Sequence, residues 1–327
     1  MFLTKRRSAA AVVAASLAFG LAACSSDDTA AESSDGKGAT ITVEDNFGEQ
    51  TVPQSAERVV LTDNRSFETL ADWGVEPVAA PMRLVPKTVT FANQDQILDM
   101  GNHKEPDFEK VVEANPDLIV TGQRFAKQRD KLIEAAPESA IVDFTPREDK
   151  PFDEELIRQT ENLGKLFGKE EEAAKLIEDF RASIDRAKKA YAGQTTMGLI
   201  TSGGEINYSA PHAGRTVGPV FDILGLKPSL EVEGTSDHQG DDISVEAIAE
   251  SDPQLIIVMD RDAAIGSKKE GSAPAADLIA DSAALQNVAA VKDGNIVYFP
   301  EDTYINESIQ TYTEFFNALA DQLEKKQ

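Results

Sequence analysis

Cysteine and histidine are scarce in this chain. It has one cysteine, Cys24, and three histidines among 327 residues. One cysteine cannot form an internal disulfide, and three histidines supply few nitrogen ligands, so neither a disulfide framework nor a cage for free zinc or manganese ions is expected. The patterns GxGxxG, GxxxxGK[ST] and GxSxG are also missing. The usual signals of nucleotide binding and of serine hydrolysis are therefore absent.

Acidic residues outnumber basic residues in the chain as a whole. The chain holds 32 Lys and Arg against 57 Asp and Glu, a formal charge of −25. This charge disfavours nucleic acid and anionic membrane surfaces as partners. An anion-binding site would therefore depend on a local cluster of arginines or lysines. The length and the 41% of apolar residues leave room for two domains, each with its own core.

A signal for export stands at the N-terminus. A basic triplet at residues 5–7 precedes an apolar run at residues 8–20, which has the length of a signal-peptide core and is short for a membrane span. The run ends in Leu-Ala-Ala-Cys24, which resembles the bacterial lipobox, in which the cysteine becomes the first mature residue and carries a lipid. A plain secretory signal or an uncleaved anchor is the alternative. We expect a signal peptide at residues 1–23, lipidation of Cys24, and a flexible tether of small and polar residues at 24–39.

Proline and glycine are absent from one long central stretch, residues 169–191. Its apolar residues recur every three or four positions, which predicts a helix of roughly 34 Å with one apolar stripe. Acidic residues open the stretch and lysines close it, the polarity that the helix dipole favours. Strand and helix patterns alternate on both sides. We therefore predict an α/β protein with an N-terminal lobe at 40–150, connecting helices at 151–192 and a C-terminal lobe at 193–327.

One segment recurs on the two sides of this helix. Residues 109–120 (EKVVEANPDLIV) match residues 246–257 (EAIAESDPQLII) at a constant offset of 137 residues. Each copy predicts a short amphipathic helix, a proline that ends it and a buried strand. An arginine follows each strand, Arg124 in the first copy and Arg261 in the second. The repetition indicates two similarly built lobes.

The whole pattern resembles the substrate-binding lipoproteins of bacterial ABC importers. It is most similar to the class that captures iron–siderophore, haem or cobalamin complexes, and the run at residues 260–266 (DRDAAIG) resembles its ferric catecholate branch. The resemblance covers residues 40–327. It implies the class III periplasmic-binding-protein fold: two Rossmann-like lobes joined by one long rigid helix, with modest lobe motion. It also implies a binding protein without enzymatic activity or intrinsic cofactor, whose ligand is an Fe(III)–siderophore complex.

The resemblance also assigns ligand-binding residues. Arg124, Arg215 and Arg261 would line the cleft between the lobes and face a ferric tris-catecholate, a trianion whose oxygens accept charge-assisted hydrogen bonds. Each arginine could instead pair with an acid of this acidic chain. His238 and Tyr304 would complete the iron coordination of a siderophore that offers four oxygens, although the chain reads His-Gln-Gly where relatives usually read His-Gly-Gln. The resemblance assigns two further pocket-lining residues, Tyr208 and Asn64.

The two repeat helices imply a partner. Glu109 and Glu246 head these helices, and in this family such glutamates dock onto arginines of the permease dimer; helix capping explains them equally well. The protein would be a monomer, attached to the cell membrane through its lipid only and facing the extracellular or periplasmic side. Alternatives are a binding protein for haem, cobalamin or another metal chelate, a cell-surface ligand sensor and, least favoured, a secreted hydrolase.

Overall fold

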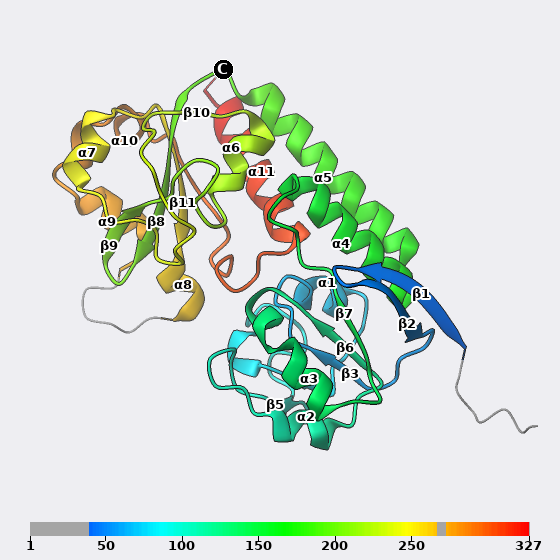
Figure 1. Cartoon of the computed structure of the whole chain (residues 1–327). Coiled ribbons are helices and arrows are strands. Elements are labelled where there is room, and N and C mark those ends of the chain that lie inside the picture. The colour runs from blue at the N-terminus through cyan, green and yellow to red at the C-terminus, as the bar shows by residue number, and fades with distance from the viewer. Residues whose placement is uncertain (1–38, 267–272, 327) are drawn as a thin grey trace, which may run out of the picture. The chain divides into compact units, whose positions relative to one another are not determined.

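Two five-stranded sheets form the framework of the protein (Figure 1). The computed structural model describes residues 39–266 and 273–326. The expected signal peptide, Cys24 and all but the last residue of the tether lie outside the described residues. Residues 38–327 group into one compact unit.

The first sheet contains only parallel pairs, in the order β5-β4-β3-β6-β7. Central strand β6 is buried on both faces, which explains the unbroken apolar run at residues 118–120. Helices α2 and α3 cover one face, and α1 with the antiparallel hairpin β1–β2 covers the other. The elements of this half are β1 (Thr40–Asp45), β2 (Gly48–Pro53), β3 (Val59–Leu61), α1 (Phe67–Asp72), β4 (Ala79–Ala80), the 3-10 helix η1 (Met82–Leu84), β5 (Leu98–Asp99), α2 (Phe108–Ala114), β6 (Leu118–Thr121), the 3-10 helix η2 (Gln123–Gln128), α3 (Arg129–Ala135) and β7 (Ala140–Asp143).

The second sheet has the parallel order β10-β8-β11-β12, and β9 pairs antiparallel with β8. Helices α6 and α11 cover one face, and α7, α9 and α10 cover the other. The elements of this half are β8 (Thr195–Ser202), β9 (Glu205–Tyr208), α6 (Gly218–Leu224), β10 (Lys227–Pro228), α7 (Val245–Glu250), β11 (Leu255–Asp260), α8 (Arg261–Ile265), α9 (Ala275–Asp281), the 3-10 helix η3 (Leu285–Asn287), α10 (Ala289–Lys292), β12 (Ile296–Tyr298) and α11 (Ile309–Glu324).

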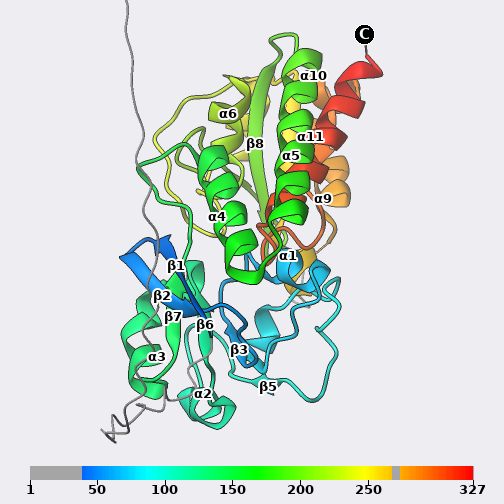
Figure 2. The ribbon, with the colours of Figure 1, turned by 90° about the vertical axis from the view of Figure 1, so that its right-hand side faces the viewer.

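The long central helix is confirmed. Helix α5 spans Glu170–Ala190, with Lys169 and Tyr191 as its caps. It runs beside α4 (Phe152–Phe167) and along α11 (Figure 2). Ala173 packs in the core of the first sheet, whereas the buried residues from Ile177 onward pack in the core of the second. The helix therefore belongs to both cores, and mainly to the second.

The repeat is confirmed down to the backbone. The two copies form α2–β6 and α7–β11, each strand central in its sheet. The residue before each proline, Asn115 and Asp252, has a φ of 43° and 41°. Asn and Asp tolerate this left-handed conformation better than other residues with a side chain, so both copies turn from helix to strand in the same way.

Two local features shape the strands. Strand β4 contains only 2 residues, and Pro77 shortly before it lacks the backbone N–H that a ladder needs. Strand β9 forms a hairpin with β8 through the glycines at 203 and 204.

Candidate functional site: an arginine-lined cleft

A cavity of about 2130 Å³ lies among loops that follow the carboxyl ends of strands from both sheets. In open α/β sheets this is where ligands bind. Arg65 follows β3, Arg124 lies in η2 after β6, and Arg261 opens α8 directly after β11. The fold therefore brings residues nearly 200 positions apart in the sequence to the walls of one cavity.

Three predicted arginines surround one tyrosine ring. The guanidinium carbons of Arg124, Arg261 and Arg215 lie 4.7, 4.8 and 5.3 Å from the ring centroid of Tyr304. Arg124 also donates from Nη2 to the backbone oxygen of Tyr304, at 2.8 Å. These distances are in the range of cation–π contacts. Three positive charges and one phenol thus converge in a cavity that is large enough for a metal complex.

The arginines change the acidity of the phenol. Burial opposes ionisation of Tyr304, but the charges of Arg124 and Arg261 outweigh it and lower the pKa of the phenol. Burial also lowers the pKa of Arg124, and repulsion from the nearby positive charge of Arg215 adds to this effect. A phenol of lowered pKa is a better oxygen donor for a hard metal ion such as Fe(III).

A histidine lies next to this tyrosine. The ring centroids of His238 and Tyr304 are 6.5 Å apart. Burial lowers the pKa of His238 and the charge of Arg261 adds to the effect, against the opposing charge of Asp237, which favours the neutral imidazole that can donate a lone pair. The loop that carries His238 is held to β9 by paired backbone hydrogen bonds between Tyr208 and Asp241.

One acid occupies the centre of the cluster. Glu307 is fully buried and accepts a bidentate pair from Arg215, with Nε at 3.1 Å and Nη2 at 2.8 Å. Arg65 approaches it to 3.4 Å. The alternative that a predicted arginine pairs with an acid therefore holds for Arg215. We call Arg65, Arg124, Arg215, Arg261, Tyr304 and Glu307 the cleft floor.

The other arginines are differently placed. Arg261 donates from Nη1 to the Ser202 hydroxyl at 3.1 Å and lies 3.9 Å from Asp262, which accepts from the backbone N–H of Gly203 on its other oxygen. Asp260 caps α8 by accepting from Ala263 and does not pair with Arg261. Within the described residues, the buried Nε atoms of Arg65, Arg124 and Arg261 have no hydrogen-bond partner. Such donors suit an anionic ligand.

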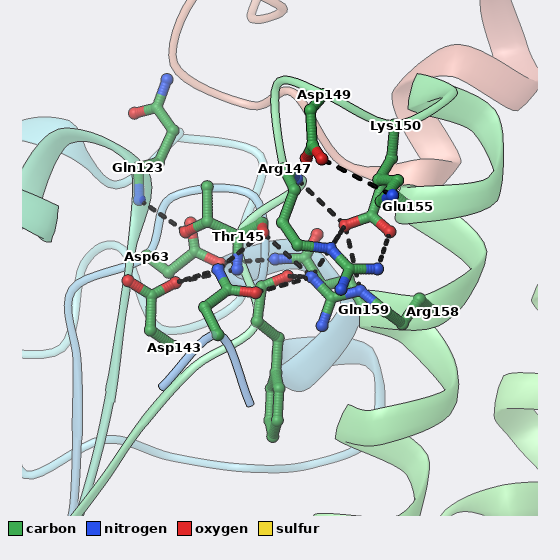
Figure 3. A network of polar contacts seen from close by, with 12 residues as sticks. Asp63, Gln123, Asp143, Thr145, Arg147, Asp149, Lys150, Glu155, Arg158 and Gln159 are labelled. Carbon is green, nitrogen blue, oxygen red and sulfur yellow. Dashed lines mark hydrogen bonds and ion pairs between the residues drawn. The ribbon is translucent and has the colours of Figure 1, made fainter. Parts of the chain in front are cut away.

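The turn before the first lobe's arginine requires a glycine. Gly122 has a φ of 157° and a ψ of −175°, a region open essentially to glycine alone. A Cβ at this position would overlap the Thr145 hydroxyl. The backbone N–H of Gln123 donates to the same hydroxyl (Figure 3). Close by, Gln159 of α4 donates to Asp63 at 2.7 Å. Burial raises the pKa of Asp63 to about 7, against the opposing charge of Arg65.

Two expected lining residues are not on the cavity. Tyr208 is 1% exposed and packs in the second sheet's core, where its hydroxyl donates to the Leu230 carbonyl at 2.9 Å. Asn64 is also 1% exposed, and its amide donates to the Ile305 carbonyl. Both side chains are buried and each donates to a backbone carbonyl, so they hold loops near the cleft in place.

Sequence reasoning missed Arg65 and His103, which line the cavity, and the buried Glu307 that pairs with its arginines. Arg65 could have been found, since it follows the apolar strand β3 as Arg124 and Arg261 follow theirs. His103 lines the cavity, and burial together with Arg124 lowers its pKa. Glu307 gave no local signal, because its partner Arg215 lies 92 residues away.

The two repeat glutamates lie on the surface. Glu109 and Glu246 are exposed in the first turns of α2 and α7. The helices are capped by other side chains, Asp107 and Ser244, which accept from backbone N–H groups. Capping therefore does not require these glutamates.

Among residues 39–266 and 273–326, no group of three or more His, Cys, Asp or Glu side chains is arranged to hold a metal ion. None of the helices in this part combines the length and the apolar character that a membrane span needs.

The fold and cleft define a binding protein with two α/β lobes, and the chain belongs to the periplasmic binding protein family, whose model matches residues 59–303. The petrobactin-binding protein YclQ of Bacillus subtilis is 28% identical over 311 residues, which cover 93% of this chain and 95% of YclQ. Its crystal structure aligns with a TM-score of 0.75 over 88% of this chain and 99% of that one, at 25% identity. The catecholate-siderophore-binding protein VctP of Vibrio cholerae aligns with a TM-score of 0.73, at 25% identity over 88% of this chain and all of VctP. The ferric-anguibactin-binding protein FatB of Vibrio anguillarum is 26% identical over 267 residues, 81% of each chain. The class III fold is thereby confirmed, and these relatives bind siderophores as ligands.

Proposed function

We propose that this protein captures a ferric siderophore of the catecholate type in the cleft and delivers it to an ABC permease. The convergence of Arg124, Arg215 and Arg261 on the Tyr304 ring carries this proposal. A ferric tris-catecholate has three negative charges and six oxygen acceptors, so guanidinium donors suit both its charge and its hydrogen-bonding groups. The relatives that bind catecholate and related siderophores support the same ligand class.

The position of Tyr304 beside His238 supports a second binding mode. A catecholate ligand with only four oxygens leaves two iron positions open. The phenol of lowered pKa and the neutral imidazole are suitable donors for them. The ferric ion would be cargo, brought in and removed with its chelator.

Delivery requires a membrane partner. The exposed Glu109 and Glu246, one on each lobe, would dock onto basic residues of a permease dimer. A monomer anchored through a lipid on Cys24 would meet it on the extracytoplasmic side of the membrane, as a binding protein without enzymatic activity. Charge reversal of both glutamates should stop uptake by cells and leave ligand binding intact; loss of binding would argue against a docking role.

A titration tests the ligand. Addition of a ferric tris-catecholate should quench the fluorescence of the single tryptophan, Trp73, or of the tyrosines at micromolar protein. A ferric trihydroxamate, which is neutral, should bind more weakly. If neither complex binds, the siderophore proposal fails. If the catecholate still binds after Arg124, Arg215 and Arg261 are together replaced by Ala, the charge-based mechanism fails even with the right ligand.

A further inference from the structure

Glu307 contacts both halves of the cleft. From the first half, Gln123 donates to its Oε2 at 2.9 Å and Arg65 lies 3.4 Å away. From the second half, Arg215 donates to both of its oxygens, and the Thr216 hydroxyl donates to Oε1 at 2.5 Å. Its side chain has no exposed surface. A buried carboxylate with this many donors is held firmly ionised, and the arginines lower the pKa of Glu307 despite the opposing effect of burial.

Two of these donors have a strained backbone. Gln123 and Thr216 have positive φ values of 46° and 65°. For a β-branched residue such as Thr216 this is a true outlier. Each lies next to a predicted ligand-binding arginine, Gln123 before Arg124 and Thr216 after Arg215. Backbone strain persists only where the surroundings hold it, and here both side chains are held by the same carboxylate.

From these contacts we propose that Glu307 positions the arginines of the cleft floor and sets the charge of ligand that the floor prefers. This role rests on the proposed function and names its specificity-determining residue. The floor carries four guanidiniums, and Glu307 offsets one of their four formal charges, so it lowers the attraction of the floor for each added negative charge on a ligand. Without Glu307, Arg65 and Arg215 would repel each other, and the two strained turns would lose their shared acceptor.

Charge can be tested separately from shape. One hexadentate tris-catecholamide chelator forms complexes of nearly the same shape with Ga(III), of charge −3, and with Ti(IV), of charge −2. We expect the wild type to prefer the gallium complex. Glu307→Gln should raise the ratio of the two affinities roughly tenfold, the effect of one unit charge on another about 12 Å away at an effective dielectric constant of about 20. Both absolute affinities should fall, since Arg215 loses its partner.

Matched variants separate charge from packing. Glu307→Asp keeps the charge but shortens the side chain, so it should weaken both complexes and leave their ratio unchanged. Arg65→Gln removes one positive charge and should lower the ratio by a similar factor. The double variant E307Q/R65Q has the wild-type formal charge and should restore the wild-type ratio. A general loss of packing would change both complexes equally in every variant.

The outcomes distinguish a failure of the charge-setting role of Glu307 from a failure of the proposed function. If the wild type binds both complexes and E307Q leaves their ratio unchanged, the charge-setting role is wrong and the proposed function stands. If the wild type binds neither complex, both proposals fail. Should E307Q not fold by circular dichroism, R65Q and the double variant carry the test, and equal ratios in these two would refute the role of Glu307.

Discussion

Replacement of Arg261 by Ala offers the sharpest test of how the cleft holds an anion. The side chain is 19% exposed, stacks 4.8 Å from the Tyr304 centroid and anchors to Ser202 by one hydrogen bond. Unlike Arg215, it does not share the buried Glu307, and the buried acid that it faces, Asp262 at 3.9 Å, keeps the backbone N–H of Gly203 as a donor when Arg261 is lost. The variant should therefore keep its fold and lose a contact with the ligand.

The expected magnitude follows from the type of bond. A hydrogen bond between charged groups contributes about 1.5–3 kcal/mol, so loss of one or more such bonds should raise Kd for a ferric tris-catecholate roughly 10–150-fold. A neutral ferric trihydroxamate should lose about half of this free energy, roughly 3–12-fold in Kd, because charge-assisted bonds are about twice as strong as neutral ones. Fluorescence titration of both ligands at a fixed salt concentration gives the comparison.

Arg186→Ala supplies the control. Arg186 lies on α5 and pairs with Asp321 and Glu324 of α11 on the exposed surface. The R186A variant loses the same formal charge as R261A, but at a surface position away from the cleft. Salt screens the effect of that charge on the ligand, so Kd should change less than twofold. If R261A and R186A weaken catecholate binding equally, the ligand does not contact Arg261 and the reasoning from the cleft geometry is wrong.

Three further predictions concern single side chains. The iron charge-transfer band of a four-oxygen ferric catecholate should change when the complex binds to the wild type. Tyr304→Phe should abolish this change, and so should His238→Ala if both side chains donate. A band that changes in the variants as it does in the wild type would show that these side chains do not bind the metal. The folded-state pKa of Asp63 is about 7, above its ordinary 3.8. Between these two values the folded protein binds a proton that the unfolded chain releases, so stability should fall as pH rises from about 4 to about 7. Asp63→Asn should remove this fall and gain roughly 2–4 kcal/mol over the wild type at pH 8 in urea unfolding; identical pH profiles would contradict the buried-acid assignment. Gly122→Ala should cost about 1–3 kcal/mol of folding stability through its backbone conformation and the overlap with Thr145. Gly48→Ala, at the β1–β2 turn, also places Ala at a positive φ but in open space, so it is the control for the backbone part alone and should cost less in urea unfolding.

The parts of the fold that rest on periodicity were predictable. Helix α5 was located to within one residue at each end, because an apolar stripe over 21 residues leaves few alternatives. The repeat located both central strands, since a strand buried on both faces must be apolar throughout. The convergence of Arg124 and Arg261 was implied by the family resemblance and not by these two signals, because β6 and β11 belong to different sheets.

Contacts between residues far apart in the sequence could not be predicted from local patterns. Tyr208 was expected on the cavity, but its polar group satisfies a buried carbonyl at Leu230, a partner that no spacing rule identifies. Glu307 follows an ordinary loop and precedes an ordinary helix, α11. Its role becomes visible only when the fold brings Arg65 and Arg215 to it from 242 and 92 residues away.

The segment between β12 and α11 connects the ligand site to both halves of the protein. It carries Tyr304, whose backbone oxygen is held by Arg124 of the first half, and Ile305, whose carbonyl is held by Asn64 of the same half. His238 and Arg261 belong to the second half. Tyr304 and Ile305 also pack in the core of the second sheet, so a turn of the halves would break the hydrogen bonds from Arg124 and Asn64. Tyr304 and His238 would then move together, while Arg124 would leave the tyrosine ring. The two side chains best suited to bind the iron would stay paired as the cleft opens, and a bound complex would lose a guanidinium before it lost a metal donor.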